Sequence, residues 1–139
     1  MIKSKYGAEK INIDGYTFDS KVEGKYYEYL KGLKAKGEIL NFELQPRFTL
    51  QPKYKNNGVN VRAIEYVADF QIYYNDLYSE IIDVKGLATP EAKMKRKMYN
   101  YQYPMPLKWV IWSKGYFRDY DTVIKERAAN KKVKENKLC

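Results

Sequence analysis

The chain has 139 residues, 45% of them apolar, which is enough to bury one core, and we predict a single domain over residues 1–130. Lys and Arg number 26 against 17 Asp and Glu, and the net charge of +9 favours nucleic acid as a partner over the alternative, an ordinary soluble surface. The absence of histidine excludes Ser-His-Asp hydrolysis, and the single Cys139 excludes an intramolecular disulfide and a multi-cysteine zinc site. No apolar run reaches signal-peptide or membrane-spanning length, so we expect a cytoplasmic protein without a membrane partner.

The first half of the chain is predicted to begin with a helix and continue with a strand. Phe18 to Lys36 carries apolar residues at helical spacing, and Gly37 marks its end. Leu40 to Leu50 contains Pro46, which favours an edge strand or a bulge over a central strand. Residues 51–60 are expected to form a long basic turn.

A hairpin and a second helix are predicted next. Val61 to Tyr74 and Tyr78 to Lys85 are rich in β-branched and aromatic residues and are separated by a short polar segment, which indicates paired strands. Thr89 as N-cap and Pro90 at the first helical position begin a helix that ends before Pro104. Its predicted apolar stripe consists of Met94, Met98 and Tyr101.

The remaining chain completes an α/β pattern. Leu107 to Trp112 is predicted as a strand, a helix follows from about Asp121, and residues 131–139 are expected to be a basic, frayed tail. The order helix, three strands, helix, strand, helix implies an α/β domain with a mixed sheet flanked by helices.

Two charged residues punctuate the otherwise buried-type strand around residues 81–86. Side chains alternate along a strand, so Asp83 and Lys85 share one face, while Ile82 and Val84 face the core on the other side. The alternative is a half-exposed strand end carrying a weak surface ion pair.

Asp69 is a second isolated acid, on the preceding strand. Asp69 and Asp83 lie on the same face only if paired residue numbers sum to 152, as when Tyr74 pairs with Tyr78 around a three-residue loop. A two-residue turn would place the two acids on opposite faces. A site that uses both acids therefore requires an odd loop or a bulge.

Glu23 on the first helix has two interpretations. Ser20-Lys21-Val22-Glu23 matches a capping box, in which Glu23 bonds back to the Ser20 amide. Glu23 also falls at the edge of the apolar stripe, from which it can point along the sheet toward Asp69. The pattern alone favours the cap.

This arrangement resembles the PD-(D/E)XK nuclease superfamily over roughly residues 18–112, with an acidic helix, an acid in one strand, Asp-Val-Lys in the next, and a helix and strand after them. Ala68 replaces the proline of the superfamily's name, at a position that varies widely. More narrowly, the chain is similar to a family of small bacteriophage proteins, and this similarity rests on four segments: Phe18–Glu23, Asp83–Gly86, Lys95–Lys97 and Tyr103-Pro104.

The resemblance implies a restriction-endonuclease-like αβββαβ fold and a metal-dependent endonuclease that hydrolyses DNA phosphodiester bonds in the cytoplasm of a phage-infected bacterium. Asp69, Asp83 and the carbonyl of Val84 would hold Mg²⁺ or Mn²⁺, ions that suit hard oxygen ligands. Lys85 would lie beside the attacking water or the scissile phosphate. The resemblance favours a role for Glu23 in the site over a role as a helix cap. Glu23 would orient a water or help hold a second ion.

Basic residues suggest where DNA binds. Lys93 and Lys97, with Arg96 nearby, form a basic face just after the active-site strand, and Lys53 and Lys55 are weaker candidates; a solvated helix face is the alternative.

One small domain offers few side chains for reading bases, so we expect selectivity for branched DNA such as Holliday junctions, and a homodimer that binds two arms of the junction. Two other functions stay open: a catalytically inactive nucleic-acid-binding module on a nuclease scaffold, and an interaction protein.

Overall fold

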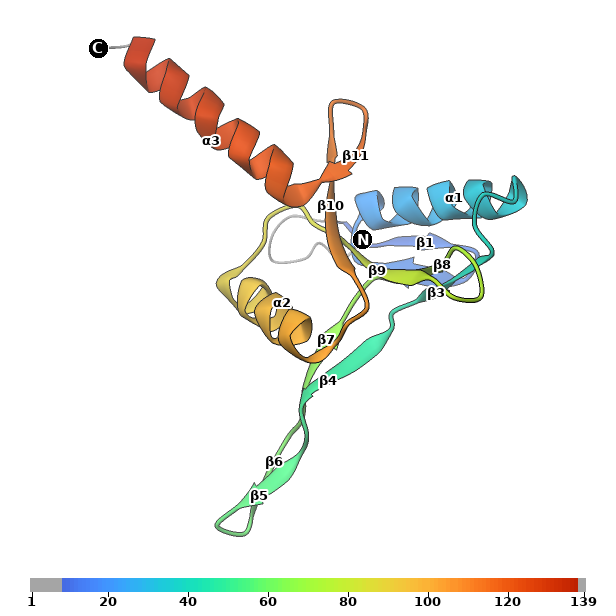
Figure 1. The fold of residues 1–139 in the computed structure, drawn as a ribbon, viewed down its shortest axis with the longest axis vertical. Coiled ribbons are helices and arrows are strands. Elements are labelled where there is room, and N and C mark those ends of the chain that lie inside the picture. Colours follow the sequence, from blue (N-terminus) through green and yellow to red (C-terminus); the bar gives the residue numbers. More distant parts are fainter. Residues whose placement is uncertain (1–8, 138–139) are drawn as a thin grey trace.

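The computed structural model describes residues 9–137, and its largest sheet contains five strands in the order β11–β10–β9–β8–β3 (Figure 1). β9 and β10 are parallel and all other neighbours are antiparallel, so the sheet is mixed. The strands are β3 (Asn41–Leu44), β8 (Phe70–Tyr73), β9 (Ser79–Val84), β10 (Leu107–Ser113) and β11 (Tyr116–Asp119). With α1 (Lys21–Ala35) and α2 (Pro90–Gln102), the order α1–β3–β8–β9–α2–β10 confirms the predicted αβββαβ core and its mixed sheet flanked by helices.

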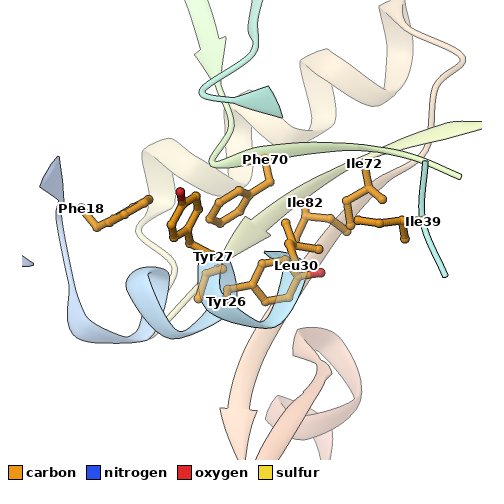
Figure 2. Close-up of a cluster of buried hydrophobic side chains, with 9 residues drawn as sticks. Phe18, Tyr26, Tyr27, Leu30, Ile39, Phe70, Ile72 and Ile82 are labelled. Carbon is orange, nitrogen blue, oxygen red and sulfur yellow. The ribbon is translucent and has the colours of Figure 1, made fainter. Parts of the chain in front are cut away.

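α1 covers one face of this sheet. The helix begins after Ser20, whose Oγ accepts a hydrogen bond from the Glu23 backbone N–H at 3.1 Å. Figure 2 shows its inward side chains meeting residues of β8 and β9 in one apolar cluster, which includes Tyr26, Tyr27, Leu30, Phe70, Ile72 and Ile82. The predicted inward orientation of Ile82 and Val84 is confirmed by this cluster.

The hairpin of β1 (Ile11–Ile13) and β2 (Tyr16–Phe18) packs against α1 and was not predicted. Phe18, predicted as the start of the first helix, is instead the last residue of β2, because the helix begins only after its cap at Ser20. Its close approach depends on Gly24, because a Cβ added there would lie 2.9 Å from Ile13 Cδ1. The hairpin therefore fixes the loop that leads into the first turn of α1.

α2 and α3 (Tyr120–Lys137) pack on the other face. Thr89 and Pro90 begin α2 as predicted. The predicted apolar stripe is partly wrong: Tyr99 is fully buried, whereas Met94 and Tyr101 are 54% and 93% exposed. Tyr99 and Tyr101 are only two positions apart, and tertiary packing against Phe48 and Tyr66 decides which of them faces inward.

α3 extends further than expected. The predicted helix start near Asp121 agrees with the observed Tyr120, but the helix continues through Lys137, within the segment expected to fray. Residues 127–137 are exposed throughout, and Lys and Ala, which favour helix without tertiary support, make up six of these eleven residues. No helix within residues 9–137 combines the length and apolar character needed to cross a membrane.

A two-stranded ribbon projects from the body of the molecule (Figure 1). β4 (Arg47–Gln51) pairs antiparallel with β7 (Ile64–Val67), and β5 (Tyr54–Asn56) pairs antiparallel with β6 (Val59–Val61). We call this ribbon, residues 47–67, the arm.

The arm corrects three predicted boundaries. The strand expected over residues 40–50 is divided at Gln45, which has a φ of 52° before Pro46, so that β3 and β4 belong to different sheets. The strand expected over residues 61–74 is likewise divided, at Ala68-Asp69. The expected basic turn is instead a hairpin around Asn57-Gly58, whose φ values of 50° and 79° are those of the turn that matches strand twist.

Candidate active site

The pairing of β8 with β9 brings Asp69 and Asp83 together. Phe70 lies opposite Ile82, and Tyr74 N–H donates to Tyr78 O at 3.1 Å, so the predicted register and three-residue loop are confirmed. The ladder becomes irregular just before β8, and the Asp69 backbone N–H donates to Asp83 Oδ1 at 2.9 Å. The two acids therefore sit side by side at the end of the paired strands.

Asp83 is 3% exposed and is held by three groups. Besides the Asp69 N–H, the Tyr66 hydroxyl donates to Asp83 Oδ2, and Lys85 Nζ lies 3.5 Å from the same oxygen. This ion pair confirms that Asp83 and Lys85 share a face, and its burial distinguishes it from a weak surface pair. Burial and the nearby Asp83 charge raise the pKa of Tyr66, so its hydroxyl remains a donor.

Asp69 interacts with two acidic neighbours, Asp83 and Glu23. Its Oδ2 accepts a hydrogen bond from the Val84 backbone N–H at 2.7 Å, which links the side chain to β9. Burial, followed by the charges of Asp83 and Glu23, raises the pKa of Asp69 well above its ordinary value of 3.8. A proton shared with the Glu23 carboxyl in a side-chain hydrogen bond acts in the same direction.

Glu23 acts both as a local cap and as part of the acidic cluster. Its Oε2 accepts a hydrogen bond from the Asp19 N–H at 3.1 Å, one residue earlier than the predicted Ser20 amide. Its carboxyl group also hydrogen-bonds the Asp69 side chain. Burial raises the pKa of Glu23 above 4.5, although both hydrogen bonds oppose this shift.

An aromatic side chain supports the basic residues of the site. Trp109 of β10 lies opposite Asp83 in the parallel pairing, and its Nε1–H donates to the Tyr66 hydroxyl at 2.8 Å. The Lys85 ammonium and the Arg96 guanidinium lie 5.0 Å and 3.8 Å from the centroid of the Trp109 ring. Lys85 is thereby held beside Asp83 while its side chain remains 21% exposed.

Two hollows open beside the first turn of α1. One, of about 310 Å³, is lined by Glu23, Asp69 and Gln45 among others. The other, of about 660 Å³, is lined by Ser20, Lys85 and neighbouring residues. Glu23 and Asp69 therefore face one of these hollows and Lys85 faces the other, whereas the buried Asp83 lines neither of the two.

The chemistry of the acidic cluster fits a hard divalent cation. Within residues 9–137, no three His, Cys, Asp or Glu side chains are positioned as a ready set of metal ligands, although Glu23, Asp69 and Asp83 interact electrostatically. Asp69 Oδ2 and Asp83 Oδ1 each accept one N–H donor, which leaves a lone pair on each of these oxygens, whereas Asp83 Oδ2 faces both the Tyr66 hydroxyl and the Lys85 ammonium. A cation would relieve the repulsion that raises the pKa of Asp69, and carboxylate oxygens suit Mg²⁺.

The predicted basic residues lie in three different settings. Lys93 and Lys97 are exposed on α2. Arg96 is half-buried. Its guanidinium stacks on the Trp109 ring, which also contacts Lys85, and pairs with Asp121 at 3.1 Å. Lys53, just before β5, and Lys55, within it, are exposed in the outer half of the arm, which projects from the sheet that carries Asp83 (Figure 1).

Sequence reasoning missed Tyr66 and Trp109. Both are buried aromatic residues whose polar atoms form a chain from Trp109 Nε1 through the Tyr66 hydroxyl to Asp83. The sequence carries one weak signal for them: a Tyr or Trp in a buried strand needs a hydrogen-bond partner for its O–H or N–H group. Fifteen tyrosines and two tryptophans compete for that interpretation. Only tertiary contacts select these two: the register of β9 and β10 places Trp109 opposite Asp83, and the Tyr66 hydroxyl bonds to both.

Comparisons with known proteins identify a family. Searches of the curated proteins and of the solved structures returned no significant match. Residues 3–118 match the family described as "Protein of unknown function (DUF1064)". This match covers most of the chain, including the whole acidic cluster, and the chain therefore belongs to the DUF1064 family.

Proposed function

We propose that this protein is a metal-dependent DNA endonuclease of the PD-(D/E)XK class. The observation that carries the proposal is the cluster that the buried Asp83 forms with the partly buried Asp69 and Lys85, reached by Glu23 from α1. Isolated buried acids are costly, and an acid in a cleft whose pKa is raised by burial and by neighbouring charges, as that of Asp69 is, is a candidate functional residue. The αβββαβ order around the cluster agrees with this class.

Asp69 and Asp83, with the carbonyl of Val84, are the residues that would hold Mg²⁺ or Mn²⁺, and Glu23 would contribute a further oxygen. When bound, such an ion stabilises phosphoryl charge and lowers the pKa of water. The backbone N–H groups of Asp69 and Val84 and the Tyr66 hydroxyl fix the carboxylates, so their orientation does not depend on the ion.

Lys85 supplies positive charge where negative charge develops during hydrolysis. Its ammonium is tethered between Asp83 and the Trp109 ring and lines the 660 Å³ hollow, where it can contact a phosphate or the attacking water. Removal of such a preorganised group costs about 10²–10³-fold in rate.

The substrate we propose is branched DNA in the cytoplasm of a phage-infected bacterium, handled by a homodimer. Lys93 and Lys97 are exposed and supply sequence-independent phosphate contacts. A domain of this size offers few groups for reading base edges, so DNA shape provides the remaining selectivity.

The test is a substrate panel. Linear duplex, flapped duplex and a four-way junction of the same sequences are incubated with the protein at equal ionic strength, with Mg²⁺, with Mn²⁺ and with EDTA. We expect metal-dependent cleavage that is fastest on the branched substrates. Equal rates on all three would leave a general nuclease, whereas tight binding without cleavage in either metal would support the inactive binding module.

A further inference from the structure

The arm is the largest feature that the acidic cluster leaves unexplained. Residues 52–60 are all exposed, so nothing within the described part of the molecule covers the outer half of the ribbon. A lone two-stranded ribbon is marginally stable in water. Its persistence as a projecting element calls for a partner that it contacts.

The charge of the arm points to a polyanion. Residues 47–67 contain one acidic residue, Glu65, which pairs with Arg47 at 3.3 Å, and three further basic ones, Lys53, Lys55 and Arg62. Side chains alternate across a ribbon, so Lys55 and its partner Asn60 share one face, which is opposite the face of Tyr54 and Val61. Lys53, Lys55, Asn60 and Arg62 all line a groove of about 440 Å³.

The root of the arm is fixed to the acidic cluster. Tyr66 of β7 donates to Asp83, so the strand that forms the arm also orients a site residue. On the other strand, Gln102 Nε2 donates to Leu50 O at 2.6 Å and the Tyr103 hydroxyl donates to Thr49 O at 2.7 Å. These contacts hold the arm at a set direction from the cluster.

The dimensions of the arm match duplex DNA. Val67 at the root lies nine positions after Gly58 at the tip, which spans at most about 30 Å of extended chain. Duplex rises about 3.4 Å per base pair, so the tip reaches about nine base pairs from the acids. The major groove, about 12 Å wide, admits a two-stranded ribbon, whereas the minor groove is about half as wide.

We propose that the arm lies in the major groove of a DNA duplex, up to about nine base pairs from the cleavage position, with Lys53, Lys55 and Arg62 on its phosphates. This inference rests on the proposed nuclease function and adds to it the requirement for a duplex segment on one side of the scissile bond. A second copy of the chain is the competing occupant, but the clustered like charge of the arm disfavours self-association.

The first test measures DNA binding by a cleavage-inactive parent, Asp83→Asn. The arm variant adds Lys53→Ala, Lys55→Ala and Arg62→Ala. The matched control instead adds Lys34→Ala, Lys36→Ala and Lys114→Ala, which remove the same charge from exposed sites outside the arm.

We expect the arm variant to bind a 25-base-pair duplex at least tenfold more weakly at about 0.1 M salt, and up to about 500-fold if all three residues contact phosphates. The slope of log affinity against log salt should fall by about 2.7, while the control keeps the parental slope. Unchanged affinity and slope in the arm variant would overturn the proposal. A change of oligomeric state in gel filtration would overturn it in favour of self-association.

The second test locates the groove by crosslinking. Val59, 66% exposed beside the tip, is replaced in Val59→Cys on a Cys139→Ser background. We expect disulfide capture of DNA that carries a thiol tether on cytosine N4, in the major groove, and not on guanine N2, in the minor groove. Capture from the minor groove alone, or from neither groove, would refute the groove assignment. Cleavage of DNA by the wild type would in that case still support the nuclease proposal. A wild-type protein that neither binds nor cleaves DNA would overturn both proposals.

Discussion

Asp69→Asn should make the protein more stable while removing the proposed activity. The Asp69 carboxyl is disfavoured in its charged form by burial and by the charges of Asp83 and Glu23. Asparagine keeps an oxygen for the Val84 N–H and gains an amide that can donate to Glu23, but carries no charge. The substitution therefore removes the repulsion and keeps the hydrogen bonds.

Two like charges within about 5 Å repel by about 3 kcal/mol at an effective dielectric of 20, and proton uptake by Asp69 relieves part of this. We expect a gain of about 1–2 kcal/mol at neutral pH without metal, or about 3–6 °C in Tm. Burial raises the pKa of Asp69 in the folded state, so this carboxyl group contributes most to the stability of the wild type below its unfolded pKa of about 3.9. That contribution is lost as the pH rises toward the folded-state pKa. The gain in stability of Asp69→Asn over the wild type should therefore be near zero at about pH 3.5 and should increase as the pH rises.

The assay is thermal unfolding in EDTA from pH 3.5 to pH 8. Glu80→Gln is the control, because Glu80 is also a buried acid at 3% exposure but pairs with Lys108 at 3.0 Å. Removing that charge breaks an ion pair and should give no gain. A loss of stability in Asp69→Asn that is independent of pH would refute the repulsive cluster.

Three further predictions address the neighbouring groups. Lys85→Ala should lower the single-turnover cleavage rate by about 10²–10³-fold and leave the Kd for DNA within about threefold; an unchanged rate would remove Lys85 from the site. Tyr66→Phe should cost about 1–3 kcal/mol in urea unfolding, because the buried Trp109 N–H loses its acceptor and Asp83 a donor; a neutral result would contradict this chain of hydrogen bonds. Lys93→Ala with Lys97→Ala should flatten the salt dependence of binding by about two units of slope on every DNA sequence, and a constant slope would indicate that this face is merely solvated.

Local rules predicted the elements whose signals are strong and short in range. Ser20, Thr89 and Pro90 mark helix starts through capping chemistry that does not depend on the rest of the fold, and the structure places them there. Local rules left two loop lengths open between β8 and β9, and a slip by one residue would reverse the face that Asp69 shares. The observed register was predicted only by requiring that Asp69 and Asp83 lie on one face.

The arm was not predictable in the same way. Its residues read as a basic loop because Pro52 and Asn57-Gly58 favour turns and Lys53 and Lys55 are charged, and their strand pairing depends on a partner segment across the turn. The break at Gln45 arises where the chain leaves one sheet for another, which is decided by tertiary packing. Trp109 joins the site only through the parallel pairing of β9 and β10, a long-range contact.

Cleavage by wild type and by Asp83→Asn on the same labelled four-way junction, with Mg²⁺ or with EDTA, tests the central proposal most directly. Asparagine preserves the shape of the side chain and its acceptor for the Asp69 N–H but removes the carboxylate charge. We expect strand cleavage by the wild type in Mg²⁺, none in EDTA, and none by the variant in either, although both proteins bind the junction. Cleavage by the variant at the wild-type rate, or cleavage that persists in EDTA, would contradict the assignment of Asp83 and its neighbours as the metal-dependent active site.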